Sequence, residues 1–189
     1  MASILTIPNL LSFLRMALIP VFVSLVYYGH GAWALAVFLI AGISDGIDGF
    51  LARKFKQETD LGTILDPIAD KLLMTSAFIV MSLPGVVPTG RHLPIPFWVT
   101  AAVVGRDVLI IVVAAAINII TGFRGFRPSI LGKASTLVQV GGITLVLIAA
   151  NFPQLKGFYL PTVYVIITTF AVVSGCHYIF HVAALMRES

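Results

Sequence analysis

Four aspartates are gathered between positions 45 and 70 of a sequence that is otherwise rich in apolar residues. Asp45 and Asp48 are three residues apart and Asp66 and Asp70 are four apart, so each pair would share one face of a helix. Carboxylates placed this close repel one another, and a charge at the centre of a membrane helix costs at least about 2.5–3.5 kcal/mol. Hard oxygen ligands of this kind suit magnesium, manganese or calcium ions. The spacing therefore predicts a divalent-cation site that supports metal-assisted chemistry.

The alternative is that these acids are solvated residues at helix ends, paired with nearby cations such as Arg53, Lys54 and Lys71. Such pairing would account for two acids but not for four. It also leaves Gly46 and Gly49 unexplained, because each glycine costs roughly 1 kcal/mol inside a helix unless a backbone or ligand must come close. We therefore favour the metal site.

The elements that position these acids are membrane helices. Of the 189 residues, 59% are hydrophobic and 11% are charged, which is more apolar surface than a soluble domain of this length could bury. Gly and Pro clusters separate apolar runs of about twenty residues, each long enough to cross a bilayer. The sequence predicts one all-α integral membrane domain over residues 1–189, with six transmembrane helices at 8–29, 32–53, 62–83, 95–121, 129–150 and 158–185.

Basic residues in the loops predict the orientation of the helices. With the N-terminus inside, the cytoplasmic side carries Arg53, Lys54, Lys56, Arg124, Arg127 and Arg187, and the other side carries Arg91 and Lys156. Both termini are expected in the cytoplasm, with the active site at the cytoplasmic ends of the second and third helices. The basic residues form no clustered stripe, so no nucleic-acid partner is expected.

The acidic segment also carries a recognisable pattern. It fits the signature D-x-x-D-G-x-x-A-R-x8-G-x3-D-x3-D through Asp45, Asp48, Gly49, Ala52, Arg53, Gly62, Asp66 and Asp70. In this respect the chain resembles the CDP-alcohol phosphotransferases, integral membrane enzymes that make phospholipids. The segments TIPNLLSFLR, LDPIADKLL and GKAST resemble the branch of the family that uses CDP-diacylglycerol.

The resemblance implies roles for these residues. The four aspartates would bind two divalent cations, Mg²⁺ or Mn²⁺, and Asp70 would also be the catalytic base. The CDP-diacylglycerol site would include Asn9, Gly49, Ala52, Arg53 and Gly62, although helix packing is an equal alternative for Asn9. The resemblance also implies a homodimer in the cytoplasmic membrane, surrounded by lipid.

The acceptor substrate depends on charges outside the acidic segment. Arg106, Asp107 and Lys133 fall inside apolar runs, where they form either a mutual salt bridge or a cationic pocket for a phosphate. We assign Arg106 and Lys133 to binding the acceptor phosphate. The run GRDVLIIVVAA has no second Arg, and Ser135 stands where glycerol-3-phosphate-using members have Lys. The resemblance therefore favours phosphatidylglycerol as acceptor, with glycerol 3-phosphate as the alternative.

Two further readings stay open. Inositol phosphate or serine could be the acceptor of an enzyme of the same family. An ion-coupled transporter, from a different class, would use the carboxylates as cation sites, but such proteins usually show internal repeats and acids near the bilayer midplane. No repeat is evident here, so the enzyme is the preferred hypothesis.

Overall fold

The computed structural model describes residues 7–55, 60–82, 95–121, 130–152 and 156–188, with side chains for 9–44, 62, 65–82, 95–119, 130–152 and 159–180. Its elements are six α-helices: α1 (Ile7–Tyr27), α2 (Gly31–Phe55), α3 (Asp60–Ser82), α4 (Phe97–Thr121), α5 (Ile130–Asn151) and α6 (Lys156–Glu188). The predicted all-helical fold is confirmed. Every predicted helix bound falls within three residues of the observed one.

Four of these helices are long and apolar enough to cross a membrane. Their candidate spans are Asn9–Tyr27, Phe97–Ile119, Ile130–Asn151 and Tyr159–Phe180, within α1, α4, α5 and α6. In α2 the described side chains end at Ser44 and give the apolar stretch Gly31–Ser44, and α3 gives no candidate span among its described residues. The chain is an integral membrane protein, and the count of six spans stays a prediction.

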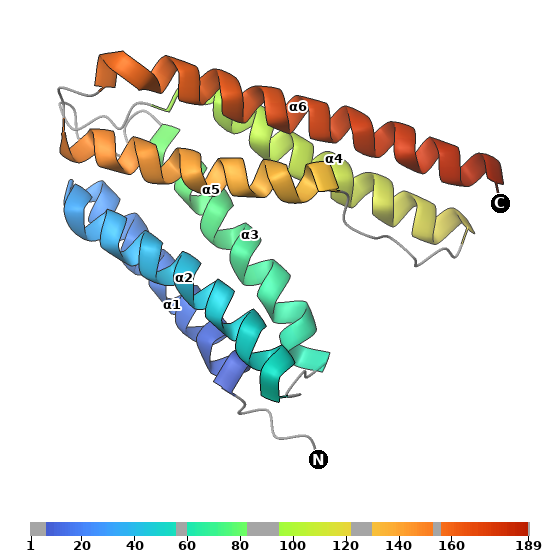
Figure 1. Cartoon of the computed structure of the whole chain (residues 1–189), viewed down its shortest axis with the longest axis horizontal. Coiled ribbons are helices and arrows are strands. Elements are labelled where there is room, and N and C mark those ends of the chain that lie inside the picture. Colours follow the sequence, from blue (N-terminus) through green and yellow to red (C-terminus); the bar gives the residue numbers. More distant parts are fainter. Residues whose placement is uncertain (1–6, 56–59, 83–94, 122–129, 153–155, 189) are drawn as a thin grey trace.

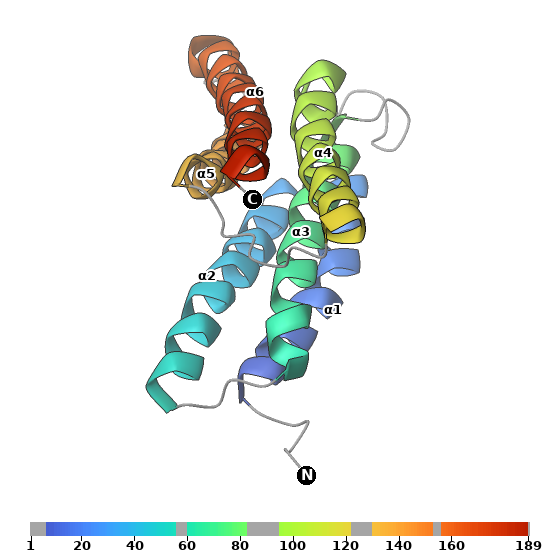
Figure 2. The same ribbon diagram turned by 90° about the vertical axis from the view of Figure 1, so that its right-hand side faces the viewer.

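The helices pack in two groups of three. In the first group α1 contacts both α2 and α3, and in the second α6 contacts both α4 and α5. Contacts between α2 and α5, and weaker ones from α3 to α4 and α5, join the groups. The ribbon shows the two groups side by side at one end and diverging toward the beginning of α1 and the end of α6 (Figures 1 and 2).

The hydrophobic core lies at the end where the groups meet. It takes its residues from the second halves of α1, α3 and α5 and from the first halves of α2, α4 and α6, including Phe22, Phe38, Phe78, Val99, Ile143 and Ile167. Because consecutive helices run in opposite directions, these halves are at the same end of the bundle. The end of α2 and the beginning of α3, which carry the aspartates, are at the opposite end, and neither Asp66 nor Asp70 belongs to the described core.

A small residue allows α5 and α6 to approach within this core. A Cβ atom added to Gly142 would overlap the end of the Ile167 side chain and lie 2.8 Å from its Cγ1 atom. Close helix contacts in membranes commonly depend on such residues. We expect Gly142→Ala to destabilise the protein by about 1–3 kcal/mol, because Ile167 is fully buried and has little room to move.

The neighbouring glycine provides the matched control. Gly141 is exposed, and a Cβ added there would have no atom within 4 Å, so Gly141→Ala should leave stability unchanged or raise it slightly. The measurement is the thermal unfolding midpoint of both variants in one detergent. Equal midpoints for the two variants would contradict the proposed contact.

Candidate active site

Asp66 and Asp70 lie one turn apart on α3, and both are half-buried. The Asp66 Oδ1 atom accepts a hydrogen bond from the Ser12 hydroxyl of α1, across 54 positions of sequence. Gly62 is buried one turn before Asp66. The packing of α1 against α3 therefore fixes one of the predicted metal ligands from a second helix.

The face of α1 that meets α3 is polar at its beginning. Asn9, Ser12 and Arg15 follow one another at intervals of three and are all buried, with Arg15 fully so. Since Ser12 contacts Asp66, this face is directed at the acidic helix. The burial of Asn9 on the same face agrees with a place near the acids, but no described contact distinguishes substrate binding from packing.

Arg15 is a residue that the sequence analysis did not single out. A fully buried guanidinium is costly unless negative charge lies nearby, so its burial one turn from Ser12 marks it as part of this region. Arg15 could have been found in the sequence because it lies inside an apolar helix rather than at a helix end, and because it belongs to the segment TIPNLLSFLR.

The other half of the acidic segment is in α2. Asp45, Asp48, Gly49, Ala52 and Arg53 all belong to this helix, which contacts α3. The helical spacing that puts Asp45 and Asp48 on one face is therefore confirmed. Their side chains lie outside the described residues, so the meeting of all four carboxylates stays a prediction.

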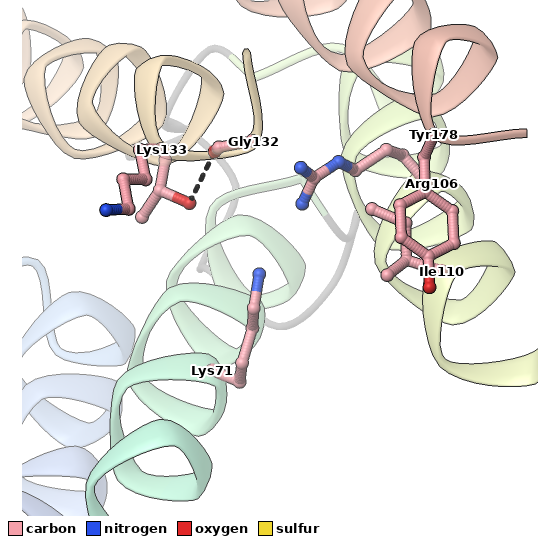
Figure 3. Close-up of a pocket in the computed structure, with 7 residues that line it drawn as sticks. Lys71, Arg106, Ile110, Gly132, Lys133 and Tyr178 are labelled. Atoms are coloured by element: carbon pink, nitrogen blue, oxygen red, sulfur yellow. Dashed lines mark hydrogen bonds between the residues drawn. The ribbon is translucent and has the colours of Figure 1, made fainter. Parts of the chain in front are cut away.

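A cavity of about 220 Å³ lies among α3, α4, α5 and α6. We call it the cationic cavity, and its lining residues are Lys71, Arg106, Ile110, Gly132, Lys133, Thr136 and Tyr178. Arg106 extends into it from α4 and Lys71 from α3, whereas the ammonium group of Lys133 points away from Arg106 (Figure 3). The two residues assigned to the acceptor phosphate, Arg106 and Lys133, thus line one cavity, together with Lys71 and Tyr178, which the assignment had left out.

Asp107 pairs with two of these cations. Its Oδ1 atom accepts a hydrogen bond from Arg106 NH1 at 2.7 Å, and its Oδ2 atom accepts one from Lys71 Nζ at 2.7 Å. Arg106 NH2 donates to the Ser174 hydroxyl of α6, also at 2.7 Å. The salt-bridge and cationic-pocket interpretations of Arg106 are therefore compatible, because the same side chain does both.

The cavity keeps an excess of positive charge. Lys133 forms no ion pair with any described side chain, and the two cations beside Asp107 share a single carboxylate. Counted over these described side chains, three positive groups and one negative group leave a net charge of +2. Such a site attracts an anionic group, and a phosphate suits the guanidinium of Arg106 in particular.

The acidic segment and the cationic cavity both take residues from α3. Lys71 follows Asp70 directly in the chain, so the ammonium group that enters the cavity and the carboxyl group of Asp70 come from adjacent residues. Half-buried carboxylates and a cationic cavity on one helical bundle suit an enzyme that acts on phosphate-bearing substrates.

Comparison with known proteins identifies the family. The family model of the CDP-alcohol phosphatidyltransferases matches residues 5–183, and the chain belongs to this family. It is therefore a phosphatidyltransferase, and the resemblance drawn from the acidic signature is confirmed.

Several relatives carry names of individual enzymes. The cardiolipin synthase (CMP-forming) of Streptomyces coelicolor is 34% identical over 155 residues, covering 77% of this chain and 66% of the relative. A protein of Mycobacterium tuberculosis named a probable phosphatidylglycerophosphate synthase is 35% identical over 161 residues, covering 80% and 70%. The cardiolipin synthase (CMP-forming) of Rattus norvegicus is 30% identical over 196 residues, covering 93% and 61%. The chain is thus similar to proteins that carry the names of two different enzymes.

Proposed function

We propose that this protein transfers phosphatidate from CDP-diacylglycerol to a hydroxyl of phosphatidylglycerol, forming cardiolipin and releasing CMP. The observation that carries the proposal is the cationic cavity, whose α3 residue, Lys71, directly follows the acidic segment in the chain. The similarity to cardiolipin synthases named as CMP-forming supports the donor and the acceptor.

In this reaction the cationic cavity holds the phosphate of the acceptor, through Arg106 and Lys133. Asp70 takes the proton from the acceptor hydroxyl as its oxygen attacks the phosphorus of the phosphatidyl group. The bond between that phosphorus and the bridging oxygen breaks, and CMP leaves with the bonding electrons. Asn9, Gly49, Ala52, Arg53 and Gly62 form the site for CDP-diacylglycerol.

Members of the family use divalent metal ions. The described acids fit such ions, because Asp66 and Asp70 offer hard oxygen ligands one turn apart and Ser12 orients the first of them. We propose that Asp45, Asp48, Asp66 and Asp70 hold two ions, Mg²⁺ or Mn²⁺. When bound, these ions neutralise negative charge on the transferred phosphate and on CMP.

We further propose six membrane spans, with both termini in the cytoplasm and the site at the cytoplasmic ends of α2 and α3. The excess of basic residues in the connections on that side supports this orientation. The location of the core at the other end leaves this end free for substrates. The proposed setting is the cytoplasmic membrane and the proposed assembly is a homodimer.

Glycerol 3-phosphate is the second candidate acceptor. The similarity to the phosphatidylglycerophosphate synthase of M. tuberculosis favours it, and the net charge of +2 in the cavity suits a dianionic phosphate. With this acceptor the same chemistry forms phosphatidylglycerophosphate.

A panel of acceptors tests the proposal. The purified protein is given labelled CDP-diacylglycerol with phosphatidylglycerol, glycerol 3-phosphate, inositol phosphate or serine, with and without Mg²⁺ or Mn²⁺, and lipids are identified by mass spectrometry. We expect metal-dependent formation of cardiolipin with phosphatidylglycerol. Product only with glycerol 3-phosphate would move the assignment to the second candidate. No CMP release with any acceptor would overturn the enzyme, and cation flux in liposomes without these substrates would favour a transporter.

A further inference from the structure

Asp107 occupies an unusual position among the charges of the cationic cavity. It is buried on α4, with 9% of its surface exposed, and each of its carboxylate oxygens accepts a hydrogen bond from a different cation. One cation, Arg106, belongs to α4, and the other, Lys71, belongs to α3. One carboxylate thus joins a helix of the first group to a helix of the second.

The position of Arg106 is fixed from two sides. Its NH1 atom is held by Asp107 and its NH2 atom by Ser174 of α6, and the side chain has only 8% of its surface exposed. Gly175 of α6 lies beside its stem, where an added Cβ would be 3.4 Å from Arg106 Cγ, an ordinary van der Waals contact. Each of the two terminal nitrogens still has a second N–H, so the guanidinium can bind a phosphate without leaving these partners.

The Lys71 side chain is more exposed than that of Arg106 and is held by fewer described contacts. Its side chain is 38% exposed and its described ion pair is the one with Asp107, at 2.7 Å. In the close-up its ammonium group points into the space that Arg106 also enters (Figure 3). Without Asp107, two like charges would face one another across this space and would separate. The negative charge of Asp107 therefore brings the two cations within reach of one anionic group.

We propose that Asp107 is the positioning residue of the acceptor site and that Lys71 is a second cation that binds the acceptor phosphate. Asp107 holds Lys71 and Arg106 as one phosphate-binding pair across α3 and α4. The site therefore takes acceptors that carry a phosphate group as well as a hydroxyl, and serine, which has no phosphate, is a poor acceptor. This inference rests on the proposed transferase function.

A purely structural role for Asp107 is the alternative, because the same ion pairs also connect α3 to α4. The chain offers a matched control for that role. Thr100, two turns before Asp107 on α4, donates a hydrogen bond to the backbone carbonyl of Phe78 on α3, at 3.2 Å. Thr100→Val removes this α3–α4 bond at the core end without touching the cavity.

The experiment measures kcat and separate KM values for phosphatidylglycerol, glycerol 3-phosphate and CDP-diacylglycerol in mixed micelles. We expect Asp107→Asn and Lys71→Met each to raise the acceptor KM by at least about tenfold, with a donor KM that stays within about twofold. Asp107→Glu should recover part of the acceptor affinity, and Thr100→Val should change neither KM. A second readout needs no turnover: acceptor alone should raise the thermal midpoint of the wild type but not that of Asp107→Asn or Lys71→Met.

The outcomes distinguish the inference about Asp107 and Lys71 from the proposed transferase function. An unchanged acceptor KM and acceptor-induced shift in Asp107→Asn or Lys71→Met would overturn the inference while leaving the transferase intact. An equal rise in donor and acceptor KM, or the same rise in Thr100→Val, would show a structural role and would also overturn it. If Asp107→Asn does not fold, Lys71→Met decides, because it keeps the pair between Arg106 and Asp107. A wild type that releases no CMP would instead refute the proposed function.

Discussion

Replacing Asp70 with asparagine is expected to lower CMP release by at least about 1,000-fold while the protein stays folded. Asparagine has nearly the same shape as aspartate but cannot accept the proton of the attacking hydroxyl, and it binds a divalent cation far more weakly. Asp70 is half-buried on the part of α3 that lies outside the hydrophobic core. The fold should therefore tolerate the loss of its charge.

The measurement is the release of labelled CMP from CDP-diacylglycerol at saturating acceptor, with the thermal midpoint and gel-filtration profile as checks of folding. Ser82→Ala is a suitable control on the same helix, because Ser82 lies at the core end and its described hydrogen bond goes to the backbone carbonyl of Ile79, at 3.2 Å. This control should keep the wild-type rate. A fully active and folded Asp70→Asn variant would show that Asp70 is not the base.

The sequence was sufficient to predict the helices and their bounds. Gly29 and Gly31 mark the first turn and a run of Gly and Pro residues marks the third, and the apolar runs between such signals have the length that a bilayer requires. Once the bounds of a helix are known, the position of each charged residue along that helix is also known. Asp66 and Asp70 accordingly lie one turn apart on α3, as their spacing predicted.

The packing of the helices could not be predicted in the same way. A membrane helix is apolar on all sides, so its hydrophobic pattern does not show which face meets another helix. Nothing in the sequence places the core at one end of the bundle or brings Gly142 against Ile167.

The same limit applies to the partners of the polar residues. Ser12 and Asp66 are 54 positions apart and Lys71 and Asp107 are 36 apart, so no local spacing connects them. The sequence named Asp107 as a possible salt-bridge partner of Arg106, which is confirmed, but it could not show that Lys71 shares the carboxylate. Tyr178 was missed because a tyrosine in an apolar helix is most often a packing residue.

Removal of divalent metal ions is expected to reduce CMP release to the background rate. Four carboxylates are proposed to surround the diphosphate of the donor, and without cations their charges would repel it. The assay compares protein treated with a chelator before and after Mg²⁺ or Mn²⁺ is restored. Full activity in the presence of excess chelator would contradict the metal site.

Replacing Ser12 tests the metal site by weakening metal binding instead of removing the metal. Its hydroxyl donates to Asp66 Oδ1 and thereby orients a proposed metal ligand, and loss of such an outer contact typically weakens metal binding by about 10–100-fold. Ser12→Ala should therefore raise the Mn²⁺ concentration needed for half-maximal activity by at least about tenfold. The same change should appear in direct Mn²⁺ binding, measured by electron paramagnetic resonance without substrate.

Ser24→Ala is the matched control on α1. Within the described part of the chain, the Ser24 hydroxyl donates to the carbonyl of Pro20 on its own helix, at 2.8 Å, in the half of α1 that is remote from Asp66. If both serine variants required the same Mn²⁺ concentration as the wild type, the contact between Ser12 and Asp66 would have no part in metal binding. If only Ser12→Ala required more, the polar face of α1 would belong to the active site, and the catalytic centre would extend over three helices rather than the two that carry the acids.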